Sequence, residues 1–218
     1  NTENKITWTN ADPLLVLGNG TSEASRHNAM VVYKNGNVVA KNTSTLIGDP
    51  GIVPLPISNS GTRMMWLPQK SAFRVGTVDG NAWNADSIGT WSFASGFNAR
   101  AKGKYTTAMG VNVEATGQKA VSLGEGTKST GYASTAMGSN TLATGQYSTS
   151  LGNSTRALGE NSMAAGHDTE ASGENAIAMG ESVKALGYAS TSLGGEQKQV
   201  VIIPPLLVMV RIRDLMHL

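Results

Sequence analysis

The apolar and small positions of this chain recur with a strict period between Gly89 and Gly194. Each unit is fourteen residues long and holds two half-repeats, each of which ends on a glycine. The glycines of the first series are Gly96, Gly110, Gly124, Gly138, Gly152, Gly166, Gly180 and Gly194. Those of the second series are Gly89, Gly103, Gly117, Gly131, Gly145, Gly159, Gly173 and Gly187. A period held without a slip predicts a solenoid, in which each unit stacks on the next, and it argues against a flexible linker.

The half-repeat before each first-series glycine alternates between large and small residues. From 105 onward, Met or Leu mostly precedes the glycine, and Thr, Val, Met or Ile lies two positions earlier. The position between them holds Ala or Ser, as in Thr107-Ala108-Met109. Because side chains alternate along a strand, this pattern predicts a strand with one large apolar face and one face of small residues. We expect both faces to be covered.

The other half-repeat carries charge. Its central position holds in turn Arg100, Glu114, Lys128, Leu142, Arg156, Glu170 and Lys184. The small residue and the Thr or Val that flank it are predicted to point inward. Neighbouring coils of a parallel solenoid lie about 4.8 Å apart, so most adjacent charges would be of opposite sign. Such exposed pairs contribute about 0.2–1 kcal/mol each and help to hold the register. The glycines are predicted to mark tight turns, where positive φ or close backbone approach excludes a Cβ.

A coil of fourteen residues is thin, and its uncharged half-repeat still has an apolar face to bury. Three chains that pack these faces around one axis would bury them, and closed cyclic symmetry is the usual arrangement of homo-oligomers. The sequence therefore indicates an oligomer, although the pattern alone does not fix the number of subunits.

Two segments carry a resemblance to a known family. They are Asn161-Ser162-Met163-Ala164-Ala165-Gly166 and Asn175-Ala176-Ile177-Ala178-Met179-Gly180, which alternate with Ala-x-Gly half-repeats. Together with 120–124 they resemble the head repeats of YadA-like trimeric adhesins. The resemblance covers about half the chain. It implies an all-β fold: a left-handed parallel β-roll with fourteen-residue repeats, in an intertwined homotrimer displayed on a bacterial surface.

The resemblance also supplies candidate ligand-binding residues. In the best-studied members, Asn-Ser-Val-Ala-Ile-Gly motifs are implicated in binding collagen and other matrix proteins, so residues 161–166 and 175–180 are the candidates here. Met163 replaces the Val of that motif, and Ala165 and Met179 replace the Ile. Adhesion as a class therefore carries over, whereas collagen itself does not. The anchoring barrel and coiled-coil stalk of the family have no counterpart in this sequence.

Residues 1–86 are predicted to form a separate β-rich segment that caps the head repeats of 87–195. Strands are expected at 6–9, 14–17, 63–67 and 72–76, and a hairpin at 29–40 turns at Asn35-Gly36. Parts of 18–37 and 61–66 resemble a segment that precedes such heads in secreted bacterial fibre proteins and phage tail fibres. Trp66, Trp83 and Trp91 are interpreted as a cap on the apolar end of the solenoid. The alternative is an aromatic carbohydrate platform.

The last residues differ in composition from everything before them. Residues 200–210 read Val-Val-Ile-Ile-Pro-Pro-Leu-Leu-Val-Met-Val, which is too short and too broken by proline to span a bilayer as a helix. In a reading frame shifted by one base, these codons can encode two glycines overlapping Val201 and Val208, where the two glycine series would continue. We therefore predict that 196–218 are a frameshift product, the alternative being a genuine apolar strand. Resequencing the source DNA tests this.

Composition excludes several classes of function. The formal net charge of +2 is too small to favour nucleic acid or an anionic membrane, and the absence of cysteine excludes thiol chemistry. His27, His167 and His217 are too scattered for a metal cluster, and no phosphate loop or nucleophile elbow occurs. We expect no catalytic residue, cofactor or metal, and no membrane insertion by this chain, which shows no signal peptide or membrane helix.

Three functions fit these observations. The first is a non-enzymatic adhesin head at the bacterial surface, attached to an extracellular matrix protein or a surface glycan, with avidity from trimerisation. The second is a receptor-binding module like that of a phage tail fibre. The third is an ice-binding solenoid, suggested by the series Thr127, Thr141, Thr155 and Thr169. We predict the first.

Overall fold

The computed structural model describes residues 13–19, 27–33, 38–40, 60–67, 70–195 and 200–202. The chain divides into two compact units, residues 1–52 and 53–218. The described residues of 60–86 belong to the same compact unit as the repeats, and the expected start of the repeats at residue 87 stays a prediction.

The first unit contains a three-stranded antiparallel sheet in the order β1-β2-β3. Its strands are β1 (Pro13–Asn19), β2 (His27–Tyr33) and β3 (Val38–Ala40). The predicted hairpin at 29–40 is confirmed, because β2 and β3 pair directly. The predicted strand at 14–17 lies within β1, whereas the one at 6–9 lies outside the described residues.

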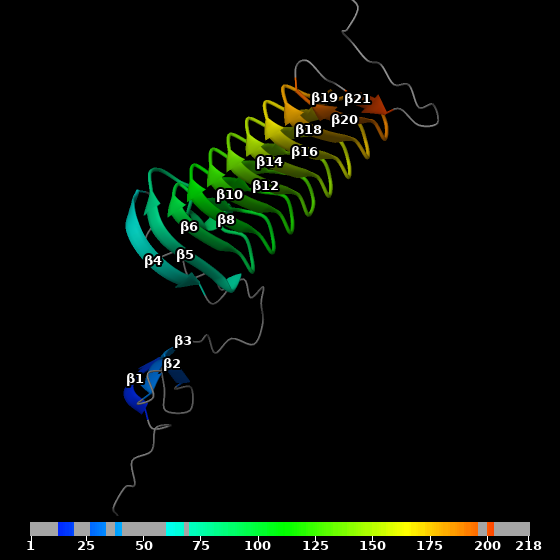
Figure 1. Ribbon diagram of the computed structural model, residues 1–218. Helices are drawn as coiled ribbons and strands as arrows, with labels where there is room; N and C mark the ends of the chain where they lie inside the picture. The colour runs from blue at the N-terminus through cyan, green and yellow to red at the C-terminus, as the bar shows by residue number, and fades with distance from the viewer. Residues whose placement is uncertain are drawn as a thin grey trace, which may run out of the picture. The chain divides into compact units, whose positions relative to one another are not determined.

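The second unit is a parallel β-solenoid, as the fourteen-residue period predicts (Figure 1). One long strand per coil contributes to the first of its two sheets, and each pairs in register with the strand fourteen residues later. These strands are β6 (Phe93–Phe97), β8 (Thr107–Val111), β10 (Val121–Glu125), β12 (Thr135–Ser139), β14 (Thr149–Asn153), β16 (Met163–His167), β18 (Ile177–Glu181) and β20 (Thr191–Gly194).

The charged half-repeats form the second sheet, which has seven two-residue strands. They are β7 (Arg100–Ala101), β9 (Glu114–Ala115), β11 (Lys128–Ser129), β13 (Leu142–Ala143), β15 (Arg156–Ala157), β17 (Glu170–Ala171) and β19 (Lys184–Ala185). Arg100 pairs with Glu114, and Glu114 in turn with Lys128, so the predicted register of the charges is confirmed.

Small residues fill the space between the two sheets. The second residue of each long strand is fully buried, for example Ala108 at 0% exposure. The short strands contribute the inward residues predicted for them, such as Thr127 and Ser129 on either side of exposed Lys128. Buried serines at the turns are satisfied locally: the Ser148 hydroxyl donates to the Gly145 carbonyl at 2.7 Å. The interior is thus narrow and lined by methyl and hydroxyl groups.

The two glycine series play different parts, and only one of them matches the predicted tight turns. Gly138, of the first series, lies inside β12 with φ of +120° rather than at a turn. Gly145, of the second series, precedes a turn at ordinary φ. A Cβ on Gly145 would stand 1.8 Å from the carbonyl oxygen of Gly159 in the next coil. A Cβ on Gly138 would likewise clash with the carbonyl oxygen of Gly152, so the close approach of successive coils requires glycine in both series.

The long-strand sheet continues beyond the repeats at its N-terminal end. β5 (Ala72–Val78) pairs in parallel with β6, and β4 (Gly61–Leu67) pairs antiparallel with β5. The predicted strands at 63–67 and 72–76 are thereby confirmed. A 3₁₀ helix, Ala85–Ser87, then leads into the first coil.

Two large side chains cover the first coil from this end. Trp83 is fully buried in a cluster with Leu67, Val78 and Ile88, and its indole N–H donates to the Ala99 carbonyl at 2.7 Å.

Arg74 is the second of these side chains. It is also fully buried, and its position in β5 pairs with Ala94, one of the interior alanines. Its guanidinium donates to the carbonyls of Ser92 at 3.0 Å and Ala101 at 2.9 Å and to the Ser92 hydroxyl at 2.7 Å.

At the other end, β21 (Val200–Ile202) pairs antiparallel with β20. The rest of 196–218 lies outside the described residues. The frameshift origin of this segment stays a prediction.

Candidate functional site

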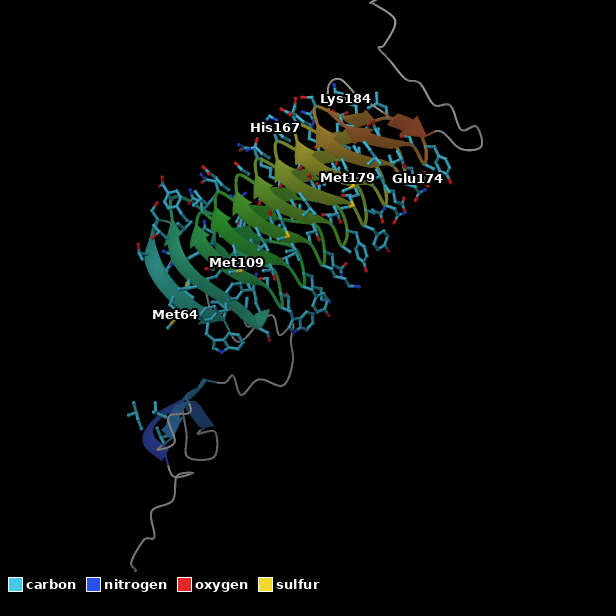
Figure 2. All side chains as sticks on the ribbon, in the orientation of Figure 1. Met64, Met109, His167, Glu174, Met179 and Lys184 are labelled. Carbon is cyan, nitrogen blue, oxygen red and sulfur yellow. The ribbon has the colours of Figure 1, made fainter. Side chains whose placement is uncertain are left out.

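The outer face of the long-strand sheet is apolar and lacks a partner within the described part of the chain. It carries the residues that precede the first-series glycines, and Met109, Met137 and Met179 remain 43%, 40% and 41% exposed. Figure 2 shows Met109 and Met179 on this face, with His167 and Glu174 projecting from its two opposite edges. The predicted two-faced strand is therefore correct, but the chain covers only the small face by itself.

The twelve candidate ligand-binding residues fall into three environments. Four of them face the interior and are at most 1% exposed: Ser162, Ala164, Ala176 and Ala178. Met163, Ala165, Ile177 and Met179 lie on the outer face of β16 and β18, where Gly166 and Gly180 also lie. Asn161 and Asn175 are exposed at one edge of the sheet. The residues of segments 161–166 and 175–180 therefore do not form one continuous binding surface in a single chain.

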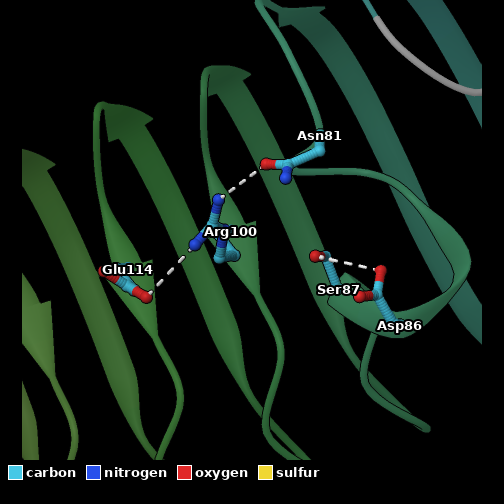
Figure 3. A network of polar contacts seen from close by, with 5 residues as sticks. All are labelled: Asn81, Asp86, Ser87, Arg100 and Glu114. Atoms are coloured by element: carbon cyan, nitrogen blue, oxygen red, sulfur yellow. Dashed lines mark hydrogen bonds and ion pairs between the residues drawn. The ribbon is translucent and has the colours of Figure 1, made fainter.

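The charged sheet presents paired ions to solvent. Arg100 lies 3.5 Å from Glu114, and its guanidinium also donates to the Asn81 side-chain oxygen at 3.3 Å (Figure 3). Nearby, the Ser87 hydroxyl donates to the Asp86 carboxylate at 3.4 Å. Arg156 and Glu170 form a second pair at 2.7 Å. Exposed pairs of this kind are worth little individually, so we assign this face to register and solubility.

The threonine series that suggested ice binding does not face solvent. Thr127, Thr141, Thr155 and Thr169 are at most 1% exposed, because they point into the space between the two sheets. A buried row cannot present a flat lattice of methyl and hydroxyl groups to ice. The observation that motivated this alternative therefore no longer supports it.

Comparison with known protein families supports the repeat assignment. The model of the YadA head domain repeat, which spans two copies, matches residues 87–112, 115–141, 143–169, 157–182 and 171–196. Residues 87–196 belong to the YadA head family. Curated proteins yielded no match to the chain.

One edge of this YadA-like head carries a row of aromatic and basic side chains that the sequence analysis missed. At this edge the chain turns through one left-handed residue per coil, for example Tyr105 at φ +61° and Tyr147 at φ +58°. The N–H of each such residue donates to a carbonyl of the preceding coil, as Tyr147 does to Tyr132 at 2.7 Å. Each coil contributes its left-handed residue and the residue before it to this edge. We call these residues in the first five coils the corner ledge: Thr90, Trp91, Lys104, Tyr105, Gln118, Lys119, Tyr132, Ala133, Gln146 and Tyr147.

The tryptophans of the predicted cap do not act together. Trp83 is buried at the end of the roll, whereas Trp66 is 44% exposed on β4 and Trp91 stacks on Tyr105 in the corner ledge. Only Trp83 covers the interior, and the three rings do not form the carbohydrate platform considered as an alternative. Fourteen-residue spacing from Trp91 to Tyr105 was the signal in the sequence for the ledge.

The histidine and acidic side chains of the YadA-like head were compared with the geometry of metal sites. Among the described residues, no three His, Asp or Glu side chains gather in a way that could hold a metal ion. His167 lies in register with Asn153 and Glu181, as predicted, and its Nδ1 is 3.8 Å from a Glu181 carboxylate oxygen. The described part of the chain also contains no helix long and apolar enough to cross a membrane.

Proposed function

We propose that this chain is the head of a trimeric surface fibre that attaches bacteria to a host matrix protein, a cell surface or a glycan, without catalysing a reaction. The YadA head family suggests an adhesin-type function of the trimeric autotransporter class, and the heads of that class are generally non-enzymatic. Trimer formation and host-surface binding follow from the family in general terms. The bacterial surface is the corresponding location.

The observation that carries this proposal is the uncovered apolar face of the long-strand sheet. Burying a Met, Leu or Ile side chain contributes about 1.5–3 kcal/mol, and each long strand from β8 to β20 offers one or two of these side chains. Exposed patches of this extent are typical of interaction sites on soluble proteins. Closed threefold packing would bury the same face of every chain, which an elongated repeat protein can do along its whole length.

This packing also sorts the candidate ligand-binding residues. A face that is buried between chains is unavailable to a ligand, which removes Met163, Ile177 and Met179. Asn161 and Asn175 lie at the edge of the sheet and remain exposed. We therefore propose that host contacts use edges and outer surfaces of the trimer, with avidity from three copies.

Light scattering of the full chain over a dilution series tests the assembly. A mass of about 68 kDa that persists on dilution is expected, three times the 22.7 kDa of one chain. Met137→Glu, on the uncovered face, should yield folded monomers. Leu142→Glu, on the charged sheet, is the matched control and should remain trimeric. A wild-type mass of 22.7 kDa would contradict the proposal.

Attachment needs its own measurement. Beads coated with the trimer are expected to bind cultured cells or matrix-coated surfaces more than beads coated with an inert protein. Equal retention of both kinds of bead on every surface would contradict the adhesive function while leaving the assembly untouched.

A further inference from the structure

The corner ledge differs in composition from the rest of the same edge. Its ten residues include four aromatic rings, two lysines and two glutamines, and none carries a carboxylate. In the next two coils the equivalent positions are Glu160-Asn161 and Glu174-Asn175. The edge is therefore basic and aromatic over its first five positions and acidic over the next two, and the last described coil has Tyr188-Ala189 there.

The two lysines of the ledge are held against the rings. Lys104 Nζ lies 4.6 Å from the centroid of the Trp91 ring and 5.2 Å from that of Tyr105. Trp91 and Tyr105 are themselves stacked, with centroids 4.7 Å apart and an interplanar angle of 4°. Cations placed over aromatic faces in this way are attracted to the ring quadrupole. Lys104 is thus partly positioned before any ligand arrives.

Lys119 is positioned similarly one coil further on. Its Nζ lies 5.0 Å from the Tyr132 ring centroid and donates to the Tyr132 hydroxyl at 2.6 Å. This hydrogen bond raises the pKa of Lys119, so the side chain is charged at neutral pH. Tyr132 in turn meets Tyr147 edge to face, with centroids 5.4 Å apart.

The ledge is also straight and exposed. Tyr105 and Tyr147 are 45% and 52% exposed, and Lys104, Gln118, Lys119 and Gln146 are exposed as well. Because corner backbones are hydrogen-bonded from coil to coil, successive positions are about 4.8 Å apart, and the ledge is about 19 Å long. A linear row of this length suits a segment of an extended polymer better than a compact ligand.

We propose that the corner ledge binds an acidic polysaccharide, a sugar chain that bears carboxylate or sulfate groups. Lys104 and Lys119 pair with its anionic groups, and the Tyr hydroxyls and Gln amides hydrogen-bond to its hydroxyl groups. Exposed ring surface contacts the apolar faces of the sugars. This inference rests on the proposed function, because it names the ligand class and the surface that an adhesive head would use.

Charge density favours a polysaccharide over a single-stranded nucleic acid. One strand carries a phosphate about every 3.4 Å, so a ledge of about 19 Å would meet five or six phosphates. The ledge offers two lysines, with Lys102 beside them. A uronic-acid polysaccharide such as hyaluronan carries a single carboxylate in each disaccharide and many hydroxyl groups, which matches two cations set among tyrosines and glutamines.

The chain itself provides conservative test substitutions. Gln occupies the position of Lys104 in two other coils, at 118 and 146, and Asn occupies that of Lys119 at 161 and 175. The double variant Lys104→Gln/Lys119→Asn should therefore fold. Lys128→Gln/Lys184→Gln, on the charged sheet, removes the same amount of charge and is the matched control. Tyr147→Ala tests the ring contribution separately.

Binding of the full chain to immobilised heparin, hyaluronan, dextran and oligothymidylate is measured by biolayer interferometry at low and physiological salt. Heparin or hyaluronan should bind, and the ledge double variant should weaken that binding roughly tenfold, while the control loses less than twofold. Heparin and hyaluronan together distinguish sulfate from carboxylate recognition. Tyr147→Ala should weaken binding without changing its salt dependence.

Several results would overturn the inference. They are equal losses in the ledge variant and its control, equal binding of dextran, tighter binding of oligothymidylate, or no binding to either acidic polymer. None of these affects the bead-attachment result, so adhesion through another surface would survive them. Conversely, polysaccharide binding through the ledge by a chain that fails to retain beads on cells would refute the adhesive function alone.

Discussion

Buried hydroxyl groups between the two sheets form hydrogen bonds with each other in some coils and not in others. We therefore expect the same substitution, Thr→Val, to change the free energy of unfolding in opposite directions at positions 141 and 155. Ser122 and Thr127 hydroxyls lie 2.7 Å apart, and those of Ser150 and Thr155 lie 2.8 Å apart. Where the long strand supplies Ala instead, the Thr141 hydroxyl is buried without a hydrogen-bond partner. Val occupies the position of these threonines at 113 and 183, so the space accommodates it.

Thr141→Val should therefore stabilise the protein. The substitution keeps the branched shape and removes a hydroxyl whose burial without a partner costs about 1–3 kcal/mol. We expect the free energy of unfolding to rise by about 1 kcal/mol per chain. Thr155→Val, by contrast, breaks a hydrogen bond and leaves the Ser150 hydroxyl buried and unpaired, so we expect a loss of about 2 kcal/mol.

Thermal unfolding followed by circular dichroism separates the two variants. For a chain of this size, 1 kcal/mol corresponds to about 2–4 °C in Tm, so the variants should differ by several degrees and lie on opposite sides of the wild type. Ala136→Ser gives Thr141 a partner and should also stabilise. Shifts of the same sign in Thr141→Val and Thr155→Val would refute the assignment of paired and unpaired hydroxyls.

Three further predictions concern the backbone and the end of the roll. Gly145→Ala should destabilise the protein by about 3 kcal/mol, because its Cβ would force the coil that contains Gly159 away. Gly187→Ala should be tolerated, because its Cβ would meet its nearest atom at 3.7 Å. Urea titration measures both changes. Burial lowers the pKa of Arg74 to about 10. The Ser92 and Ala101 carbonyls also accept backbone N–H groups, so they keep a hydrogen bond when the guanidinium is removed. Arg74→Met should therefore leave the stability at pH 7 unchanged or raise it by about 1 kcal/mol. The stability difference between Arg74→Met and the wild type should shrink as the pH rises above about 10, because Arg74 loses its proton in the folded state before it does so in the unfolded state. Urea titrations at pH 7 and pH 11 measure the change. Ala133→Gly, at φ +52°, should raise Tm by a few degrees in calorimetry, since alanine is strained in the left-handed region.

The repeat architecture was predictable because each coil restates the same pattern. The position of Met109, one before a glycine and opposite Ala108, recurs in coil after coil, and so does the alternation of Arg100 with Glu114. A single short strand of this kind would be ambiguous, but a fixed phase over seven coils leaves only one register. The paired charges and the inward Thr127 follow from that register without further assumptions.

Features that occur once were less predictable. Arg74 occupies a position that pairs with Ala94, where the repeat would call for a small neutral residue. It is accommodated because the Ser92 and Ala101 carbonyls, which already accept backbone N–H groups, each have a second lone pair that accepts from its guanidinium. Trp83 and Trp66 look alike in sequence, yet one is buried and the other is 44% exposed. Which aromatic side chain closes an end depends on the path of a single turn, and no periodicity reports on that.

The candidate ligand-binding residues stay a prediction, and they were chosen from segments that repeat. The motif segments at 161–166 and 175–180 are prominent because they repeat, and repetition selects residues that the fold itself needs. Ser162 and Ala176 are therefore buried, and the apolar residues beside them face a surface suited to a partner chain. A surface used for recognition is better sought where the repeat varies, since the fold does not dictate the residue there.

The corner ledge meets that criterion, and its backbone strengthens the argument. The left-handed corner position requires φ near +55°, which costs an ordinary residue about 1–2 kcal/mol and suits Asn or Gly. The chain uses Asn there at 161 and 175 but uses Trp91, Tyr105, Lys119 and Tyr147 nearer the N-terminal end, all at positive φ. Stability does not explain why four of the five ledge corners carry a large side chain at a strained φ that Asn would relieve, the fifth being Ala133. Strain of this kind persists where the side chain has another use, and here the shared property of the four is a basic, aromatic surface.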